Sequence, residues 1–245
     1  MEPRTPSGEG GGFLTTRWSV VVSMRAVDEQ RSRAALEDLC RDYWLPLYAF
    51  LRRRGLDGER AADVVQGFLA RLVEKRDFGE LAPERGRFRA FLLAALQHHL
   101  AHEREKDRAW KRGGRAAHVS IDPADADSRL QLAEHRELAP ERAYERAWAL
   151  ELLARVLLDL RSEYETEGKV ALFERIKPAI QGGELADVAR LARELGMSEG
   201  AVKVAGTRLR RRYKERLRAA IRDTVEQEAD VEDEIRALFR ALSAR

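Results

Sequence analysis

The chain has little of what several classes of protein require. Its 245 residues include one cysteine, Cys40, which excludes an internal disulfide framework and a cysteine-based zinc ribbon. Apolar runs end well short of the roughly 20 residues that cross a bilayer, so we expect no membrane span. The opening MEPRTPSGEGGG is polar and lacks the apolar core of a secretion signal. These absences favour a cytoplasmic protein.

Strand signals are also scarce, because β-branched residues rarely cluster and Val20–Val22 stands alone. Apolar residues instead recur at steps of three and four, the spacing of one face of a helix. We therefore predict an all-α fold with two helical domains joined by a linker. The expected divisions are a disordered N-terminus at 1–12, a first domain at 13–112, an extended or loosely ordered linker at 113–141, a second domain at 142–221 and an acidic helical tail at 222–245.

The charges nearly balance, with 45 Lys and Arg against 42 Asp and Glu, but they are unevenly distributed. Residues 203–218 contain eight basic residues and one acidic residue. Residues 226–245 contain six acidic residues and three basic ones. A basic patch of this kind neutralises phosphates, so the distribution favours a nucleic-acid partner.

The segment DVARLARELGMSEGAVKVAGTRLRRRY has the features of a helix-turn-helix. Gly196 can end the first helix in the left-handed conformation, and Ser198 can cap the second. Leu191, Leu195, Met197 and Val202 lie at positions that face a shared core. A basic second helix supplies the phosphate contacts that anchor such a motif in the major groove. The alternative is an amphipathic hairpin with a solvated basic face, and Gly206 either permits a close approach or weakens the helix.

The predicted DNA contacts of this segment share one basic helix. They are Ser198, Glu199, Lys203, Val204, Thr207, Arg208, Arg210 and Arg211.

Both halves together resemble the extracytoplasmic-function subfamily of bacterial RNA polymerase sigma factors, over roughly 31–112 and 142–221. ALEDLCRDYWLPLYAFLRRRG is similar to the opening helix of that family, and ADVVQGFLARLVEK to the helix that docks on the polymerase beta-prime subunit. GRFRAFLLAALQHHLAHEREKDRAWKRGG resembles the part that opens the promoter and reads its minus-10 element. LARELGMSEGAVK matches the helix-turn-helix that reads the minus-35 element.

The resemblance implies two further sets of site residues. The polymerase-docking helix would present Asp63, Gln66, Arg71 and Glu74. The minus-10 surface would be formed by aromatic, basic and imidazole side chains, which stack on and bind unpaired bases. These are Phe88, Arg89, His98, His102, Arg104, Lys106, Arg108, Trp110, Lys111 and Arg112.

His98 and His102 lie one helical turn apart and raise the alternative of a metal site. His99 occupies the place of the Glu that a zinc protease needs, so we prefer DNA or solvent as the partner of these imidazoles and expect no metal or cofactor. No nucleophile or paired carboxylates accompany them, so we expect no catalytic residues and no enzyme.

The tail has an apolar stripe from Val231 to Leu242 on an acidic helix. It either packs against the second domain or folds over the recognition helix and lowers its affinity for DNA.

The function that the sequence predicts is that of a sigma factor. Its partners would be core RNA polymerase, through the beta-prime and beta subunits, and promoter DNA, with an anti-sigma factor or other regulator as a further candidate. The alternative is a helix-turn-helix regulator that binds duplex DNA without polymerase.

Overall fold

The computed structural model describes the backbone at 29–75, 87–107, 123–130, 137–181, 185, 187–225 and 227–243. Side chains are described at 41–72, 87–101, 123–130, 137–180, 185, 187–225 and 227–243. Across these ranges the chain is all-α, as predicted, and contains no strand. The α-helices are α2 (Glu29–Arg53), α3 (Gly58–Lys75), α4 (Phe88–Asp107), α5 (Pro123–Arg129), α6 (Pro140–Thr166), α7 (Val170–Ile176), α8 (Val188–Leu195), α9 (Glu199–Arg222) and α10 (Val231–Ser243). Two 3₁₀ helices, η2 (Lys177–Gln181) and η3 (Glu228–Asp230), precede α8 and α10.

The buried apolar side chains form two groups. The first hydrophobic cluster unites α2, α3, α4 and α5 with the N-terminal half of α6, the end of α9 and α10. Aromatic rings fill its centre: Trp44 stacks on Tyr48 with centroids 5.0 Å apart, and Phe88 meets Tyr43 edge-on at 5.4 Å. Such pairs add about 0.5–1.5 kcal/mol each beyond the burial of their area.

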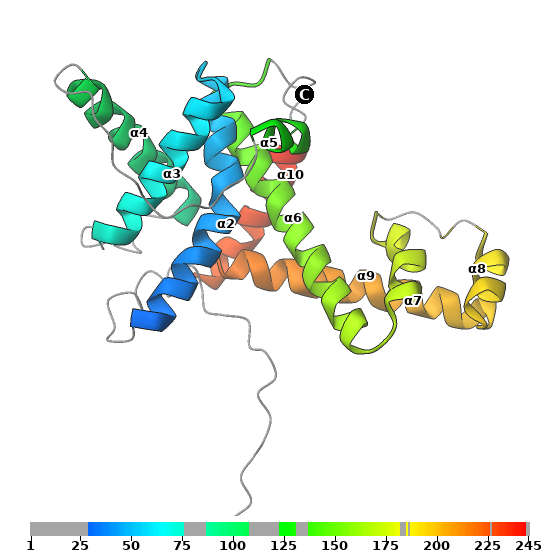
Figure 1. The fold of residues 1–245 in the computed structure, drawn as a ribbon. Coiled ribbons are helices and arrows are strands. Elements are labelled where there is room, and N and C mark those ends of the chain that lie inside the picture. The colour runs from blue at the N-terminus through cyan, green and yellow to red at the C-terminus, as the bar shows by residue number, and fades with distance from the viewer. Residues whose placement is uncertain are drawn as a thin grey trace, which may run out of the picture.

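The second hydrophobic cluster joins the C-terminal half of α6 to α7, α8 and the first half of α9. Leu160 and Phe173 are fully buried there, and the Tyr164 ring tilts against Phe173 at 5.3 Å. Since α6 and α9 belong to both clusters, they connect them. Figure 1 shows the consequence: α7, α8 and the first half of α9 project to one side of the bundle formed by the other helices.

The range predicted as an extended or loosely ordered linker contains a helix, α5, that packs against the first cluster. Ala126 and Leu130, in and just after α5, are buried. Asp127 accepts hydrogen bonds from the Tyr48 hydroxyl at 2.7 Å and from Arg52 Nη2 at 2.7 Å. Burial opposes ionisation of this carboxyl, but the hydrogen bonds from Arg52 and Tyr48 outweigh it and lower the pKa of Asp127. At 123–130 the chain is therefore helical and packed, and the expectation of extended or loosely ordered chain is wrong there.

The C-terminal tail is helical, as predicted, but its contacts extend beyond the second domain and the recognition helix, the two partners that the sequence suggested for it. Val231, Leu238 and Ala241 of α10 are buried in the first cluster, against α6 and the end of α9. Glu234 is 0% exposed and forms ion pairs with Arg89, and with Arg87 at 2.8 Å, beside the first turn of α4. The tail therefore joins the C-terminal end of the chain to the segment that resembles the promoter-melting part, and it leaves the outer face of α9 uncovered.

Candidate nucleic-acid interface

The helix pair α8–α9 is held by caps at three of its ends. Asp187, in the left-handed conformation at φ 51°, caps α8 by accepting a hydrogen bond from the Arg190 N–H at 3.0 Å. Gly196 ends α8 with φ 62°, and Ser198 Oγ accepts from the Ala201 N–H at 3.2 Å to begin α9. The predicted roles of Gly196 and Ser198 are confirmed. The cap by Asp187 was not predicted, although Asp is among the residues that favour this position.

The inner face of the pair packs into the second cluster as its spacing predicted. Leu191, Ala192 and Val202 are buried, while Leu195 and Met197 are half-buried against the same group. A buried face of this kind fixes how α9 is presented to solvent.

Gly206 is buried in the middle of α9. A Cβ atom at this position would lie 2.9 Å from Leu185 Cδ1 and 3.5 Å from Ala179 Cβ. The neighbours of Gly206 are thus side chains, and the close approach of another backbone segment is not among these contacts. Gly206 leaves room for the Leu185 side chain against α9.

The outward face of α9 consists of the exposed side chains that follow one another at helical spacing along its free side. They are Glu199, Lys203, Val204, Thr207, Arg208, Arg211 and Lys214. The Thr207 hydroxyl donates to the Lys203 carbonyl at 3.0 Å, which holds that hydroxyl against the helix. Arg211 and Glu215 lie 3.6 Å apart with both side chains largely exposed, so this pair adds little rigidity.

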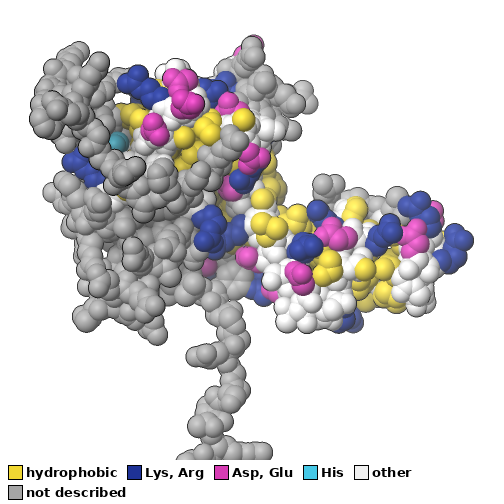
Figure 2. All heavy atoms as spheres, viewed as in Figure 1, with side chains coloured by type: hydrophobic (Ala, Val, Ile, Leu, Met, Phe, Trp, Pro, Cys, Tyr) yellow, Lys and Arg dark blue, Asp and Glu magenta, His cyan; other side chains and the backbone are white. Residues whose placement is uncertain are grey.

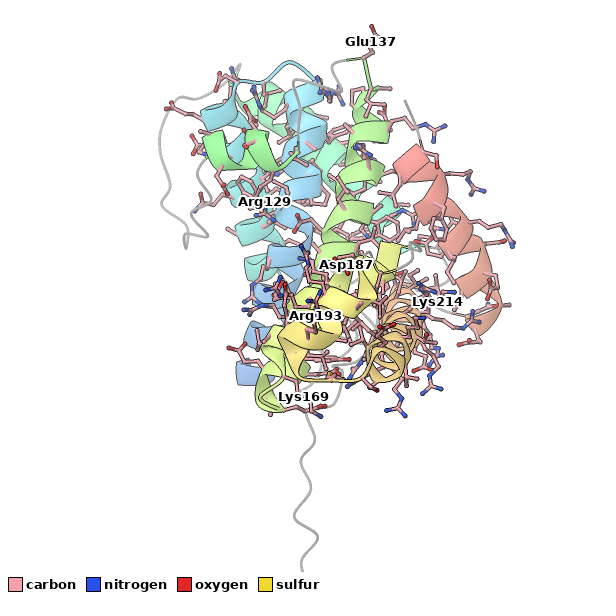
Figure 3. All side chains as sticks on the ribbon, turned by 90° about the vertical axis from the view of Figure 1, so that its right-hand side faces the viewer. Arg129, Glu137, Lys169, Asp187, Arg193 and Lys214 are labelled. Atoms are coloured by element: carbon pink, nitrogen blue, oxygen red, sulfur yellow. The ribbon has the colours of Figure 1, made fainter. Side chains whose placement is uncertain are left out.

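Lys214 was missed by the sequence analysis, although it lies three residues beyond Arg211. Figure 3 looks along α9 and shows Lys214 on that helix with Arg193 on α8. Arg193 and Arg190 are exposed on α8, and Lys and Arg side chains gather over that tip of the molecule (Figure 2). The exposed basic surface therefore covers both helices of the pair.

Other arginines of the basic run turn inward. Arg210, a predicted DNA contact, is half-buried and its Nε donates to the Ala179 carbonyl at 2.8 Å. Arg212 and Arg216 both form ion pairs with Glu163 of α6. These bonds join α9 to α6, so this part of the basic run serves packing. Arg210 is thus held against η2 by its Nε, and its contact with DNA stays a prediction.

The last arginines of the run meet the acidic tail. Arg218 forms an ion pair with Glu232, and Arg222 Nε lies 2.7 Å from Glu228. The acidic segment thus neutralises the C-terminal end of α9.

In α4, two of the residues expected at the minus-10 surface are buried. Phe88 is 0% and Arg89 5% exposed. The Arg89 guanidinium lies over the Trp148 ring, 4.3 Å from its centroid, and pairs with Glu234. Burial lowers the pKa of this guanidinium. Phe88 and Arg89 as exposed base contacts are therefore wrong for this conformation.

Of the other residues expected at the minus-10 surface, His98 has a described side chain and the rest do not. His98 is exposed, in agreement with a solvent-facing imidazole, while the neighbouring His99 ring lies 5.6 Å from Phe68. Predicted positions whose side chains lie outside the described part are His102, Arg104, Lys106, Arg108, Trp110, Lys111 and Arg112.

The expected polymerase-docking residues lie on α3, whose buried side holds Val65 and Phe68. Asp63 is exposed, Gln66 and Arg71 are half-buried, and the Glu74 side chain lies outside the described residues. An exposed edge beside a buried stripe is thus present at Asp63.

Within the described side chains, no group of three or more His, Cys, Asp or Glu residues is arranged to hold a metal ion. Among the helices that the structure describes, none has both the length and the apolar character for crossing a bilayer.

No protein-family model matches the chain, and neither the curated proteins nor the solved structures contain a significant match.

Proposed function

We propose that this protein is a sigma factor: a non-enzymatic, cytoplasmic protein that binds core RNA polymerase and directs it to promoters. The observation that carries the proposal is the α8–α9 pair, acting as a helix-turn-helix with a basic outward face on a helix whose inner face is buried. That arrangement is what insertion into a DNA major groove requires. The order of segments that resemble the sigma family supports the choice among DNA-binding proteins.

In this proposal α9 reads the minus-35 element. Its N-terminal residues would contact base edges, because that end of a recognition helix lies deepest in the groove. Arg208, Arg211 and Lys214, further along the same face, would bind phosphates and fix the register. Affinity for free DNA would then fall steeply with salt, since phosphate contacts release counterions.

The first hydrophobic cluster would support the polymerase contacts. α3 would dock on the beta-prime subunit with Asp63 in its exposed edge, and the segment from α4 onward would hold the opened minus-10 strand. In the free protein Arg89 is paired with Glu234, so any role of this arginine in the minus-10 contact requires α10 to move.

That pairing also favours a second candidate, a helix-turn-helix regulator that acts without polymerase. In such a protein the helices of the first cluster, joined by the ion pairs of Glu234 with Arg87 and Arg89, would have a structural role or form a dimer interface and would not open DNA strands. A dimer would bind paired half-sites about one helical turn apart.

The experiment that tests the proposal is co-purification of the full chain with core RNA polymerase, followed by run-off transcription on genomic fragments. We expect stable association and transcripts from a defined set of start sites. The double variant Lys203→Ala, Arg208→Ala should keep its association with core enzyme and lose those transcripts. Arg161→Ala is the matched control, because Arg161 is a partly exposed arginine of α6 outside the α8–α9 pair.

Tight binding of duplex DNA by a dimer, with no association with core polymerase, would support the regulator instead. Absence of both activities would contradict DNA binding by α9 altogether.

A further inference from the structure

Val204 is an exposed apolar side chain in the middle of a polar surface. It is 48% exposed, and the other exposed large hydrophobic residues of the described ranges, Leu158 and Phe239, lie on α6 and α10. Its neighbours on the outward face of α9 are Lys203 and Thr207. An isopropyl group therefore stands among charged and hydroxyl groups on the surface that would face DNA.

Packing within the chain does not account for a valine at this position. The buried side of α9 is formed by Val202, Gly206 and Leu209, and Val204 belongs to neither hydrophobic cluster. A β-branched residue on a solvent-exposed helix face is less favourable than alanine, because the helix restricts its χ1 rotamers. A contact outside the chain would give this side chain a role.

The place of Val204 on the helix limits what that contact can be. α9 begins after Ser198, so Val204 lies less than two turns from its N-terminal end, where a recognition helix meets base edges. Arg208 and Arg211, further along the same face, are placed to hold phosphates while the first turns enter the groove.

Among the base edges that line a major groove, the thymine 5-methyl is the apolar group. Guanine, adenine and cytosine present hydrogen-bond donors and acceptors there, which an isopropyl group cannot satisfy. We propose that Val204 is a specificity-determining residue that selects thymine by packing against its 5-methyl group. This inference rests on the proposed DNA binding by α9 and adds to it the identity of one base.

The test removes the thymine 5-methyl group and, separately, the two methyl groups of the Val204 side chain. A pool of randomised duplexes is enriched on the full chain at low salt, with and without core RNA polymerase, to obtain its preferred sequence. Each thymine of that sequence is then replaced singly by uracil, which keeps base pairing and lacks the 5-methyl. Affinities are measured for the natural chain, for Val204→Ala and for Leu158→Ala.

We expect one thymine, or two adjacent ones, to be sensitive to replacement by uracil. The natural chain should lose about fourfold in affinity there, the value of one buried methyl group. Val204→Ala should bind the thymine duplex several-fold less tightly and should not distinguish it from the uracil duplex. Leu158→Ala, the matched exposed apolar residue on α6, should behave as the natural chain does. Because Val204 is exposed and alanine favours helices, the variant should fold normally.

Three results would overturn the inference. Uracil replacement without effect at every thymine, in a duplex that the chain binds specifically, would refute the reading of thymine and leave DNA binding by α9 standing. Equal sensitivity of the natural chain and Val204→Ala to the same uracil would assign the methyl contact to another residue. If neither selection arm enriches a sequence, the proposed function fails together with the inference.

Discussion

Replacing Glu234 with glutamine should destabilise the protein more than any other single change of charge in α10. The glutamine keeps the size of the side chain, so no cavity forms, but it removes the negative charge that faces Arg89 and Arg87. Glu234 is 0% exposed and the Arg89 side chain is nearly as buried, so Arg89 would be left in the interior without its counter-ion. Loss of one partner of a buried ion pair costs about 3–5 kcal/mol.

We expect the lower end of that range, about 3 kcal/mol, for two reasons. The Trp148 ring, 4.3 Å from the guanidinium carbon of Arg89, still attracts the cation after the substitution. Arg87 is 38% exposed and can turn to solvent. With a urea m-value of about 3 kcal/mol/M, the unfolding midpoint should fall by about 1 M.

The assay is urea unfolding at pH 7, followed by circular dichroism, with Glu232→Gln as the matched control. Glu232 belongs to the same helix and pairs with Arg218, but its side chain is 57% exposed, so its loss should cost about 0–1 kcal/mol. The double variant Arg89→Met, Glu234→Leu removes both buried charges and should recover most of the stability lost in Glu234→Gln. Equal midpoints for the Glu234→Gln and Glu232→Gln variants would refute the reasoning.

Three further predictions concern other parts of the molecule. Gly206→Ala should be less stable than Gly200→Ala by about 1 kcal/mol in thermal or urea unfolding, because a Cβ at Gly206 meets the terminal Leu185 Cδ1 at 2.9 Å and displaces it, whereas one at Gly200 meets nothing within 4 Å. Alanine gains helix propensity at both positions, so equal stabilities would contradict the packing role of Gly206. Asp127→Asn should cost about 1 kcal/mol, since the Asp127 side chain is about one-third exposed, and Asp125→Asn on the same helix is its control. Because the pKa of Asp127 is lowered by folding, the ionised carboxylate stabilises the protein fully above the unfolded carboxyl pKa of about 3.9, and this stabilisation is lost as pH falls through the folded pKa. The difference in stability between the natural chain and Asp127→Asn should therefore shrink from pH 6 to pH 3 in thermal melts. A difference independent of pH would argue against an ionised Asp127. Arg208→Ala should make the slope of the logarithm of the DNA-binding constant against the logarithm of salt concentration less steep by about 0.9. Arg216→Ala should leave this slope unchanged, because the Arg216 side chain pairs with Glu163. Similar slopes for both variants would refute the division of the basic run into outward and inward arginines.

The sequence predicted those features of the fold that depend on residues close together in the chain. The helical segments follow from apolar residues at steps of three and four, and the turn around Gly196 and Ser198 follows from conformational and capping preferences within three residues. α5 was missed because it contributes only Ala126 and Leu130 to the core. Its stability depends on Tyr48 and Arg52, which lie more than seventy residues earlier in the chain.

Predictions about the site were weakest for charged side chains whose partners lie far away in the sequence. From its sequence neighbours alone, Arg89 has the charge and the setting expected of a residue that contacts DNA bases. Its counter-ion, Glu234, follows Val231 by three residues and precedes Leu238 by four, so helical spacing places it on the apolar face, apart from its exposed neighbours Glu232 and Asp233. Nothing near Glu234 in the sequence, however, identifies Arg89 as its partner. The same holds for Arg210 and Arg216, whose inward orientation depends on Ala179 and Glu163.

The continuous helix α6 sets the rotational phase between the two hydrophobic clusters. Its 27 residues span about 40 Å, with Leu152 in the first cluster and Leu160 in the second. One residue inserted between them would turn the second cluster by about 100° around the α6 axis relative to the first. Because α9 also packs into both clusters, that rotation would require the end of α9 to leave the first cluster or α9 to bend. The two helices therefore fix the relative rotation of the clusters together, and a change of length in one of them alone would strain the other.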